Sequence, residues 1–219
     1  MDSFSLTRKL VVAAHAGLAG ALAGAIVLHV GWAKRVNTAG HAFSDYALSE
    51  DADWIFTGTV VCLSAGSAAL MAGLVRSTLP VGGSAKALLG VWCGGLALTA
   101  LFRTDPVGGV PSVGGLVHRY AAGGAIAALP VAGLLIARRL ARLPGSEATA
   151  RALRRISWAS AAGGLAFLYA HLCAAILDPT PAVRSIGGWM GLAERVALAL
   201  ELGLLLSLAG VVRAGGESR

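Results

Sequence analysis

A carboxylate and an imidazole in the middle of the chain have types and spacing suited to acid–base chemistry. Asp105 lies two residues after Arg103 and thirteen residues before His118, and the intervening Gly/Pro-rich arc returns all of them to one membrane surface. A carboxylate, an imidazole and guanidiniums at one interface suit either proton transfer or the binding of an anion. We therefore predict that Asp105 and His118 are catalytic and that Arg103 and Arg119 hold an anionic head group.

Two glutamates near the end of the chain lie inside an apolar segment. Glu194 and Glu201 are seven residues apart, which places them on one face of a helix about 10 Å apart along its axis. An ionised carboxylate near mid-span costs about 3 kcal/mol on insertion scales, so Glu201 is expected to have a partner or to be protonated. We name Glu201 as a candidate acid, with Glu194, His171 and Tyr169 as candidate substrate-binding residues, and His171 within reach of Glu194. A hydrogen-bonded network that only joins helices remains the alternative.

The segment before the second apolar run is acidic and adds further candidates. It contains Asp45, which we include among the catalytic residues, and then Glu50, Asp51 and Asp53. Ser49 followed by acids is also typical of a helix start, so some of these carboxylates are expected only to cap a helix.

Aromatic side chains near these acids are candidates for lining a substrate cavity. Trp54, Tyr120 and Tyr169 could stabilise a carbocation through cation–π contacts. For Trp54 the competing interpretation is an aromatic residue at the membrane interface.

No cofactor is predicted, and the sequence offers two metal-binding alternatives. His118, Asp105, His171 and Asp178 have acceptable ligand chemistry for a divalent metal, without a diagnostic spacing. Asp178 is followed by proline and is as well explained as part of a turn. Haem is disfavoured, because the histidines of the first helix, fourteen residues apart, have no matching pair on a second helix.

The composition requires that these residues be positioned by membrane helices. Of the 219 residues, 56% are hydrophobic and only 13% are charged, against about 25% charged in soluble domains. A domain of this size cannot bury so much apolar surface in a core of its own. Soluble enzymes, coiled coils, collagen and disordered chains are excluded. The three cysteines lie in apolar runs without a CxxC pattern, which disfavours a disulfide framework or a zinc ribbon.

Six segments are long and apolar enough to span a membrane as helices. The chain is therefore predicted to be an all-α polytopic bundle forming one domain over residues 1–219. The spans are expected at about 10–33, 54–75, 85–102, 117–137, 156–177 and 189–212. Small residues along them, such as Gly20 and Gly24, indicate close helix packing.

The distribution of basic residues predicts the orientation. Twelve of the 18 Lys and Arg residues fall on the side of the termini, six of them within residues 138–155. The positive-inside rule places both termini and this segment in the cytoplasm, in a multi-pass protein of the cell membrane. The net charge of +7 therefore does not require nucleic acid as a partner. Residues 138–155 could also bind anionic lipid head groups, although a topology signal explains them.

Two short motifs connect this sequence with a known family. The first is Ser44-Asp-Tyr-Ala-Leu48, followed by an acidic residue and Trp54; the second is Phe102-Arg-Thr-Asp-Pro106, with His118 at the next helix start. In order and spacing they resemble the domain-of-unknown-function 998 family of bacterial six-helix membrane proteins, over nearly the whole chain. The family's second motif usually begins Phe-Pro-Thr-Asp, whereas this chain has Arg103, an extra cation beside the predicted site. The resemblance implies the fold and points to the site, but implies no activity.

Two functions from different classes follow as expectations. The first is a membrane-embedded enzyme that acts on a lipid or isoprenoid by carboxylate/His acid–base chemistry in the outer half of the bilayer, in the manner of a terpene cyclase or of a lipid hydrolase or transferase. The alternative is a non-catalytic lipid-binding protein or partner subunit, with a small transporter as its weaker variant. A homo-oligomer is compatible with either.

Overall fold

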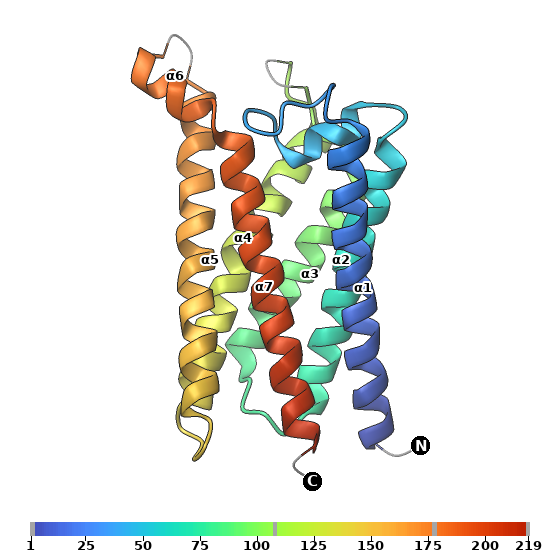
Figure 1. Ribbon diagram of the computed structural model, residues 1–219, viewed down its shortest axis with the longest axis vertical. Coiled ribbons are helices and arrows are strands. Elements are labelled where there is room, and N and C mark those ends of the chain that lie inside the picture. Colours follow the sequence, from blue (N-terminus) through green and yellow to red (C-terminus); the bar gives the residue numbers. More distant parts are fainter. Residues whose placement is uncertain (1–2, 107–108, 177–178, 218–219) are drawn as a thin grey trace.

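The computed structural model describes residues 3–106, 109–176 and 179–217, and these are helical over most of their length. The long helices lie roughly along one axis (Figure 1). In chain order the elements are α1 (Ser3–Gly31), the 3₁₀ helix η1 (Phe43–Leu48), α2 (Asp53–Arg76), α3 (Gly83–Leu101), α4 (Val113–Leu140), α5 (Glu147–Ala174), α6 (Pro181–Gly187) and α7 (Met190–Glu217).

The two ends of the bundle differ in what they carry. Both termini lie at the end drawn at the bottom of Figure 1, which we call the lower end, together with the α2–α3 and α4–α5 connections. The upper end carries η1, the α3–α4 connection and α6. The segment that contains Asp45 and the Phe102–Pro106 motif therefore lie at the same end of the bundle. This is expected because two membrane-spanning helices, α2 and α3, separate them.

Six of the described helices are long and apolar enough to cross a membrane, which confirms the predicted all-α, six-span fold. The segments that meet this criterion are Leu6–Gly31, Asp53–Arg76, Gly83–Leu101, Val113–Leu140, Glu147–Ala174 and Met190–Arg213. Many side chains on their outer surfaces are large and apolar, as a lipid-facing surface requires.

The helices pack as a closed ring in the order α1, α2, α3, α4, α5, α7 and back to α1. Helix α7 also contacts α2 and α4, so it lies towards the middle of the bundle. The last helix, which carries both intramembrane glutamates, is therefore surrounded by other helices.

The fifth helix begins earlier than the apolar pattern predicts. Helix α5 starts at Glu147 rather than near residue 156, and the α4–α5 connection shortens to residues 141–146. The arginines of residues 138–155 are thus mostly helical. Ala, Leu and Arg favour helix strongly, so the helix continues beyond the part that hydropathy marks as membrane-spanning.

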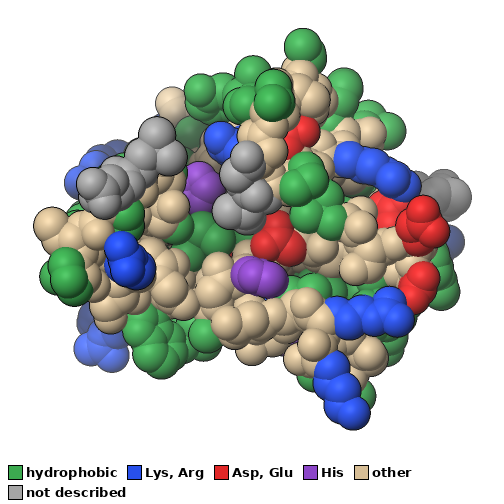
Figure 2. Space-filling view, turned by 90° about the horizontal axis from the view of Figure 1, so that it is seen from above, with side chains coloured by type: hydrophobic (Ala, Val, Ile, Leu, Met, Phe, Trp, Pro, Cys, Tyr) green, Lys and Arg blue, Asp and Glu red, His purple; other side chains and the backbone are tan. Residues whose placement is uncertain are grey.

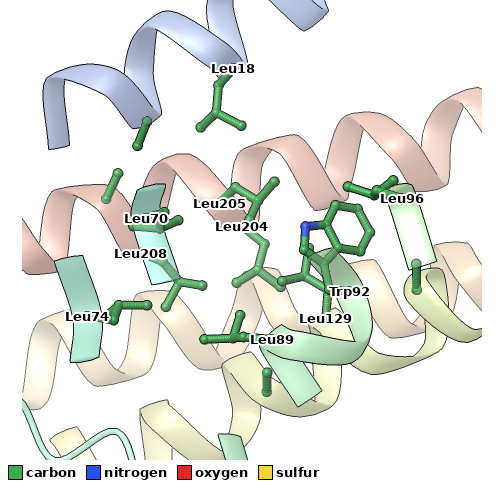
Figure 3. Packing of buried hydrophobic residues seen from close by; sticks show 14 of the residues in the cluster. Leu18, Leu70, Leu74, Leu89, Trp92, Leu96, Leu129, Leu204, Leu205 and Leu208 are labelled. Carbon is green, nitrogen blue, oxygen red and sulfur yellow. The ribbon is translucent and has the colours of Figure 1, made fainter. Parts of the chain in front are cut away.

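The buried hydrophobic cluster runs through the bundle around α7 and reaches the upper end at Phe43 and Tyr46 of η1. Figure 3 shows leucines of α7 meeting side chains of α1, α2, α3 and α4. The labelled residues are Leu18, Leu70, Leu74, Leu89, Trp92, Leu96, Leu129, Leu204, Leu205 and Leu208. Trp92 is fully buried, and its indole N–H donates a 2.9 Å hydrogen bond to the hydroxyl of Ser67 on α2. The polar edge of the largest core side chain is therefore satisfied within the bundle.

Two glycines allow α1 and α2 to approach closely. A methyl group built on Gly17 would lie 2.6 Å from the Cα of Gly66, which leaves no room for a side chain. Gly20 faces Cys62, and Gly24 faces Thr59, so the small residues of α1 lie along its contact with α2. Close backbone contact of this kind is how membrane helices associate without a hydrophobic driving force.

We predict that Gly17→Val lowers the free energy of unfolding by about 1–3 kcal/mol, because α1 and α2 must separate to admit the side chain. The measurement is thermal or denaturant unfolding of the purified protein in detergent. Gly94→Ala is the matched control, because nothing lies within 4 Å of a methyl group at that position of α3. Equal stability of the two variants would contradict the assigned α1–α2 contact.

Candidate functional site

Acidic and histidine side chains gather at the centre of the upper end. Figure 2, which views this end from above, shows an acidic and a histidine side chain next to each other near the middle of the face, and further acidic side chains beside Lys and Arg towards its edge. The side chains come from the connection after α1, from the α3–α4 connection and from the first turns of α7.

Glu194 fastens the η1 segment to the top of α7. Its side chain is buried, and its Oε2 accepts a 2.6 Å hydrogen bond from the backbone N–H of Phe43. The segment after α1 and the start of α7 also touch at Gly191. A side chain at this position would collide with the carbonyl oxygen of His41. The backbone N–H of Leu192 donates to the carbonyl of Ala39. The long connection after α1 is therefore held down on α7.

Arg195 joins the same segment to α1. Its Nε–H donates a 2.7 Å hydrogen bond to Nε2 of His29, and its Nη1 donates to the carbonyls of His41 and Gly191. Nδ1 of His29 lies 2.7 Å from the carbonyl oxygen of Ala25, so both ring nitrogens contact hydrogen-bonding groups of the protein.

Aromatic rings surround the Arg195 guanidinium. Its Cζ lies 6.0 Å from the ring centre of Phe43 and 5.9 Å from that of Tyr46. The His29 ring stacks on Phe43, with 5.7 Å between centroids. Cation–π contact in this half-buried place adds to the hydrogen bonds that hold the guanidinium.

Asp45 lies beside this cluster, within η1. Its Oδ2 accepts a hydrogen bond from the backbone N–H of Ala42. Burial raises the pKa of Asp45 above its ordinary value, against the lowering effect of His41, the Ala42 N–H and Arg195. Asp45 is thus a carboxyl group whose charged form is disfavoured, as expected of a proton-transferring group, and it lies near Glu194 rather than near Asp105.

His118 binds the end of a helix. The side chain is buried, and its Nδ1 lies 2.7 Å from the carbonyl of Phe102 and 3.1 Å from that of Thr99. These carbonyls belong to the last turn of α3, which has no further helical N–H groups to satisfy them. His118 therefore donates to α3, and no hydrogen bond to Asp105 is found among the described residues.

Asp105 binds the start of the following helix. Its two oxygens accept hydrogen bonds from the hydroxyl of Ser112, at 2.7 Å, and from the Ser112 backbone N–H, at 2.9 Å. Ser112 in turn caps α4. These bonds from Ser112 lower the pKa of Asp105, with smaller contributions from the charges of Arg119 and His118. Asp105 is thus placed as an anion that orders the α3–α4 connection.

The two arginines predicted to hold an anion have different surroundings. Arg103 makes an ion pair with Asp53 at the start of α2. Arg119 is exposed on α4. Arg103, the departure from the family's usual motif, therefore ties the end of α3 to α2.

Glu201 differs from the other acids in its surroundings. It lies near the middle of the span Met190–Arg213 and is only 1% exposed. Neither of its carboxyl oxygens has a hydrogen-bond partner among the described residues. An ionised carboxylate buried at this depth without a partner carries a large desolvation cost.

The remaining predicted side chains face the bundle surface or make local contacts. Nδ1 of His171 lies 3.3 Å from the sulfur of Met190, and no hydrogen bond joins it to Glu194 in the part of the chain that is described. Trp54, Tyr120 and Tyr169 are 71%, 75% and 59% exposed. All three lie near the upper ends of their helices, where aromatic residues favour the membrane interface. They do not converge on the acids.

An apolar groove lies between α5 and α7 in the upper half. It has a volume of about 330 Å³ and opens towards the side of the bundle. Its lining residues are Gly163, Ala166, Trp189, Leu192, Ala193 and Val196. The groove is apolar, as a surface that faces hydrocarbon chains requires, and its α7 residues come from the first two turns; neither Glu194 nor Glu201 lines it.

The donor sets considered for metals are not assembled in the described part of the chain. No three His, Cys, Asp or Glu side chains come together there as metal ligands. Asp178 lies outside the described residues. Both ring nitrogens of His29 have hydrogen-bond partners within the protein, so this ring does not fit haem ligation.

Sequence analysis missed the Arg195–His29 pair and the part played by Phe43 and Tyr46. The pair is 166 residues apart in sequence, so spacing could not reveal it. One sequence signal was available: Arg195 lies inside an apolar span, and a cation there requires a partner.

Six described helices of membrane-spanning length and composition define a multi-pass membrane protein. Within that class, the chain belongs to a family described as protein of unknown function (DUF998), whose model matches residues 15–211. This confirms the resemblance seen in the two motifs. No curated protein and no solved structure matches the chain.

We predict that Glu194→Ala releases the η1 segment from α7, because the Phe43 N–H loses its buried acceptor. Leaving such a group unsatisfied costs about 1–3 kcal/mol, so amide exchange across residues 39–48 is expected to rise about tenfold or more by hydrogen-exchange mass spectrometry. Glu194→Gln is the matched variant, because its amide oxygen still accepts, and it is expected to retain most of the protection. Unchanged exchange in Glu194→Ala would show that the bond does not hold the segment.

Proposed function

We propose that the protein is a membrane-embedded enzyme that transfers protons to and from a lipid or isoprenoid substrate entering from the bilayer. The observation that carries this proposal is Glu201, a buried carboxyl group near mid-span with no partner among the described residues. Intramembrane ionisable groups are rare, and one that holds no other group in place is a functional candidate by default.

The chemistry assigned to Glu201 is that of a neutral acid. In an apolar site a protonated carboxyl can donate to an alkene or an epoxide oxygen, as burial disfavours its charged form. A cyclisation or isomerisation needs no further reactant, because the cation formed by proton addition loses a proton to a carboxylate. Glu194 lies on the same face of α7, about 10 Å away along the axis, and Asp45 lies beside it at the upper end. Either carboxyl group, in its ionised form, is a candidate acceptor of the proton that the cation loses, and return of that proton to Glu201 restores the acid for the next turnover.

This assignment changes the expected roles of the first candidates. Asp105 and His118 were predicted as the catalytic pair, but each is hydrogen-bonded to a helix end. We now propose that they keep the α3–α4 connection in shape and that the reacting proton belongs to α7. A cell-membrane location in bacteria, with both termini in the cytoplasm, is part of the same proposal and rests on the Lys and Arg distribution.

The second candidate is a non-catalytic lipid-binding protein. The open apolar groove between α5 and α7 favours it, because such a groove could hold a lipid chain without any reaction. An enzyme is expected to lose conversion of its substrate when Glu201 is replaced. A lipid-binding protein is expected to change, at most, in how much lipid it binds.

The test is conversion of a panel of polyprenyl alcohols, their epoxides and phospholipids by the protein in lipid nanodiscs, followed by mass spectrometry. Glu201→Gln is expected to reduce turnover about 100-fold or more, because an amide cannot donate the proton. Glu50→Gln is the matched control, an exposed acid at the upper end, and is expected to leave turnover unchanged.

Two results would contradict the enzyme proposal. One is full turnover by a folded Glu201→Gln variant. The other is stoichiometric lipid bound equally by wild type and variant with no conversion of any panel member, which would establish the lipid-binding function.

A further inference from the structure

A second groove lies at the lower end, between α4 and α5, far from the glutamates of α7. Its volume is about 310 Å³. The lining residues are Ala137, Arg138, Ala141, Glu147, Ala150, Arg151 and Arg154. The two helices are direct neighbours in the ring, as Figure 1 also shows.

The charges of this groove are predominantly positive and free to bind. Arg138 extends from the last turns of α4, and Arg151 and Arg154 from the first turns of α5. None of the three guanidiniums has a hydrogen bond or an ion pair with any residue that the structure describes. Glu147 is the acidic residue of the lining, and its Oε1 accepts a hydrogen bond from the backbone N–H of Gly145.

The floor of the groove is made of small side chains. Ala137 and Ala150 are buried between the two helices. The small side chains therefore leave room for an anion between the guanidiniums and close to the helix backbones. Three forked donors around one depression match the several oxygens of a phosphate group.

The level of the groove relative to the bilayer is marked by Trp158. This residue is 61% exposed and lies one turn beyond Arg154, on the same side of α5. The exposed large side chains farther up α5 are Leu165, Leu168 and Leu172, with Tyr169 near the upper end of the helix. Exposed tryptophan is typical of the boundary between hydrocarbon and head groups, which places Arg151 and Arg154 at head-group level.

We propose that this groove is a binding site for the phosphate of an anionic phospholipid, with the acyl chains lying along α4 and α5 above it. Positive charge at head-group level, beside an apolar surface, is complementary to a molecule that carries a phosphate on a hydrocarbon tail. A soluble phosphate compound matches the three arginines but not the apolar surface above them. The site is separate from the proposed catalytic residues, so it does not depend on the enzyme proposal.

The experiment measures lipid binding to the delipidated protein in a neutral detergent by native mass spectrometry. The probes are short-chain phosphatidylglycerol, phosphatidylcholine of the same chain length, and inorganic phosphate. The test variant is R138Q/R151Q/R154Q. The control variant is R76Q/R142Q/R155Q, which removes the same charge from exposed arginines that do not line the groove.

The proposal predicts that phosphatidylglycerol binds more tightly than phosphatidylcholine, and that the test variant weakens it about tenfold or more. The control variant is expected to weaken it less than threefold. Glu147→Gln leaves every arginine in place and removes a negative charge from the groove, so it is expected to strengthen binding of phosphatidylglycerol severalfold. This variant tests the proposal if the triple variant does not fold.

Three results would overturn the proposal. Equal loss of binding in the test and control variants would mean that only net charge matters. Equal binding of phosphatidylcholine would show that the phosphate charge is not recognised in the groove. Binding of inorganic phosphate as strong as that of the lipid would show that a soluble anion, rather than a phospholipid, is the occupant.

Discussion

Polar groups in a bilayer must find their partners within the protein, because no water is present to satisfy them. Most of the upper end is organised by this constraint. His118 donates to the free carbonyls at the end of α3, and Asp105 accepts from Ser112 at the start of α4. Glu194 accepts from the Phe43 N–H, and Arg195 is held by a histidine and two carbonyls. The same residues that suggest chemistry in the sequence are thus largely engaged in closing helix ends and fastening a connection.

Glu201 is set apart by the same constraint. Its carboxyl oxygens are buried at mid-span without a partner among the described residues, although the leucines of α7 around it are closely packed. A protein that only needed to fill this position would be more stable with an apolar side chain there. The carboxyl group at this position is the physical reason why the proposed function is centred on α7 rather than on the Asp105–His118 region.

Most of the fold could be predicted from the sequence, because membrane helices are specified by long apolar runs that need no knowledge of their neighbours. Helix α5 extends below its predicted span, since Glu147 to Arg155 is helical without being apolar. The site was less predictable. The order of residues indicates which side chains reach one end of the bundle, but not which pairs form. Arg195 with His29 and Arg103 with Asp53 depend on the ring order of the helices. The lack of a hydrogen-bond partner for Glu201 depends on the side chains of every helix that packs against α7.

The most direct measurement of the central claim is an infrared spectrum of the protein in lipid at neutral pH, compared with that of the Glu201→Gln variant. The account predicts that the wild-type protein has the C=O band of a neutral carboxylic acid and that this band is missing from the variant. A difference spectrum that contains only the bands of an ionised carboxylate would contradict the account. Glu201 would then be a charged group with a partner, and no longer a proton donor.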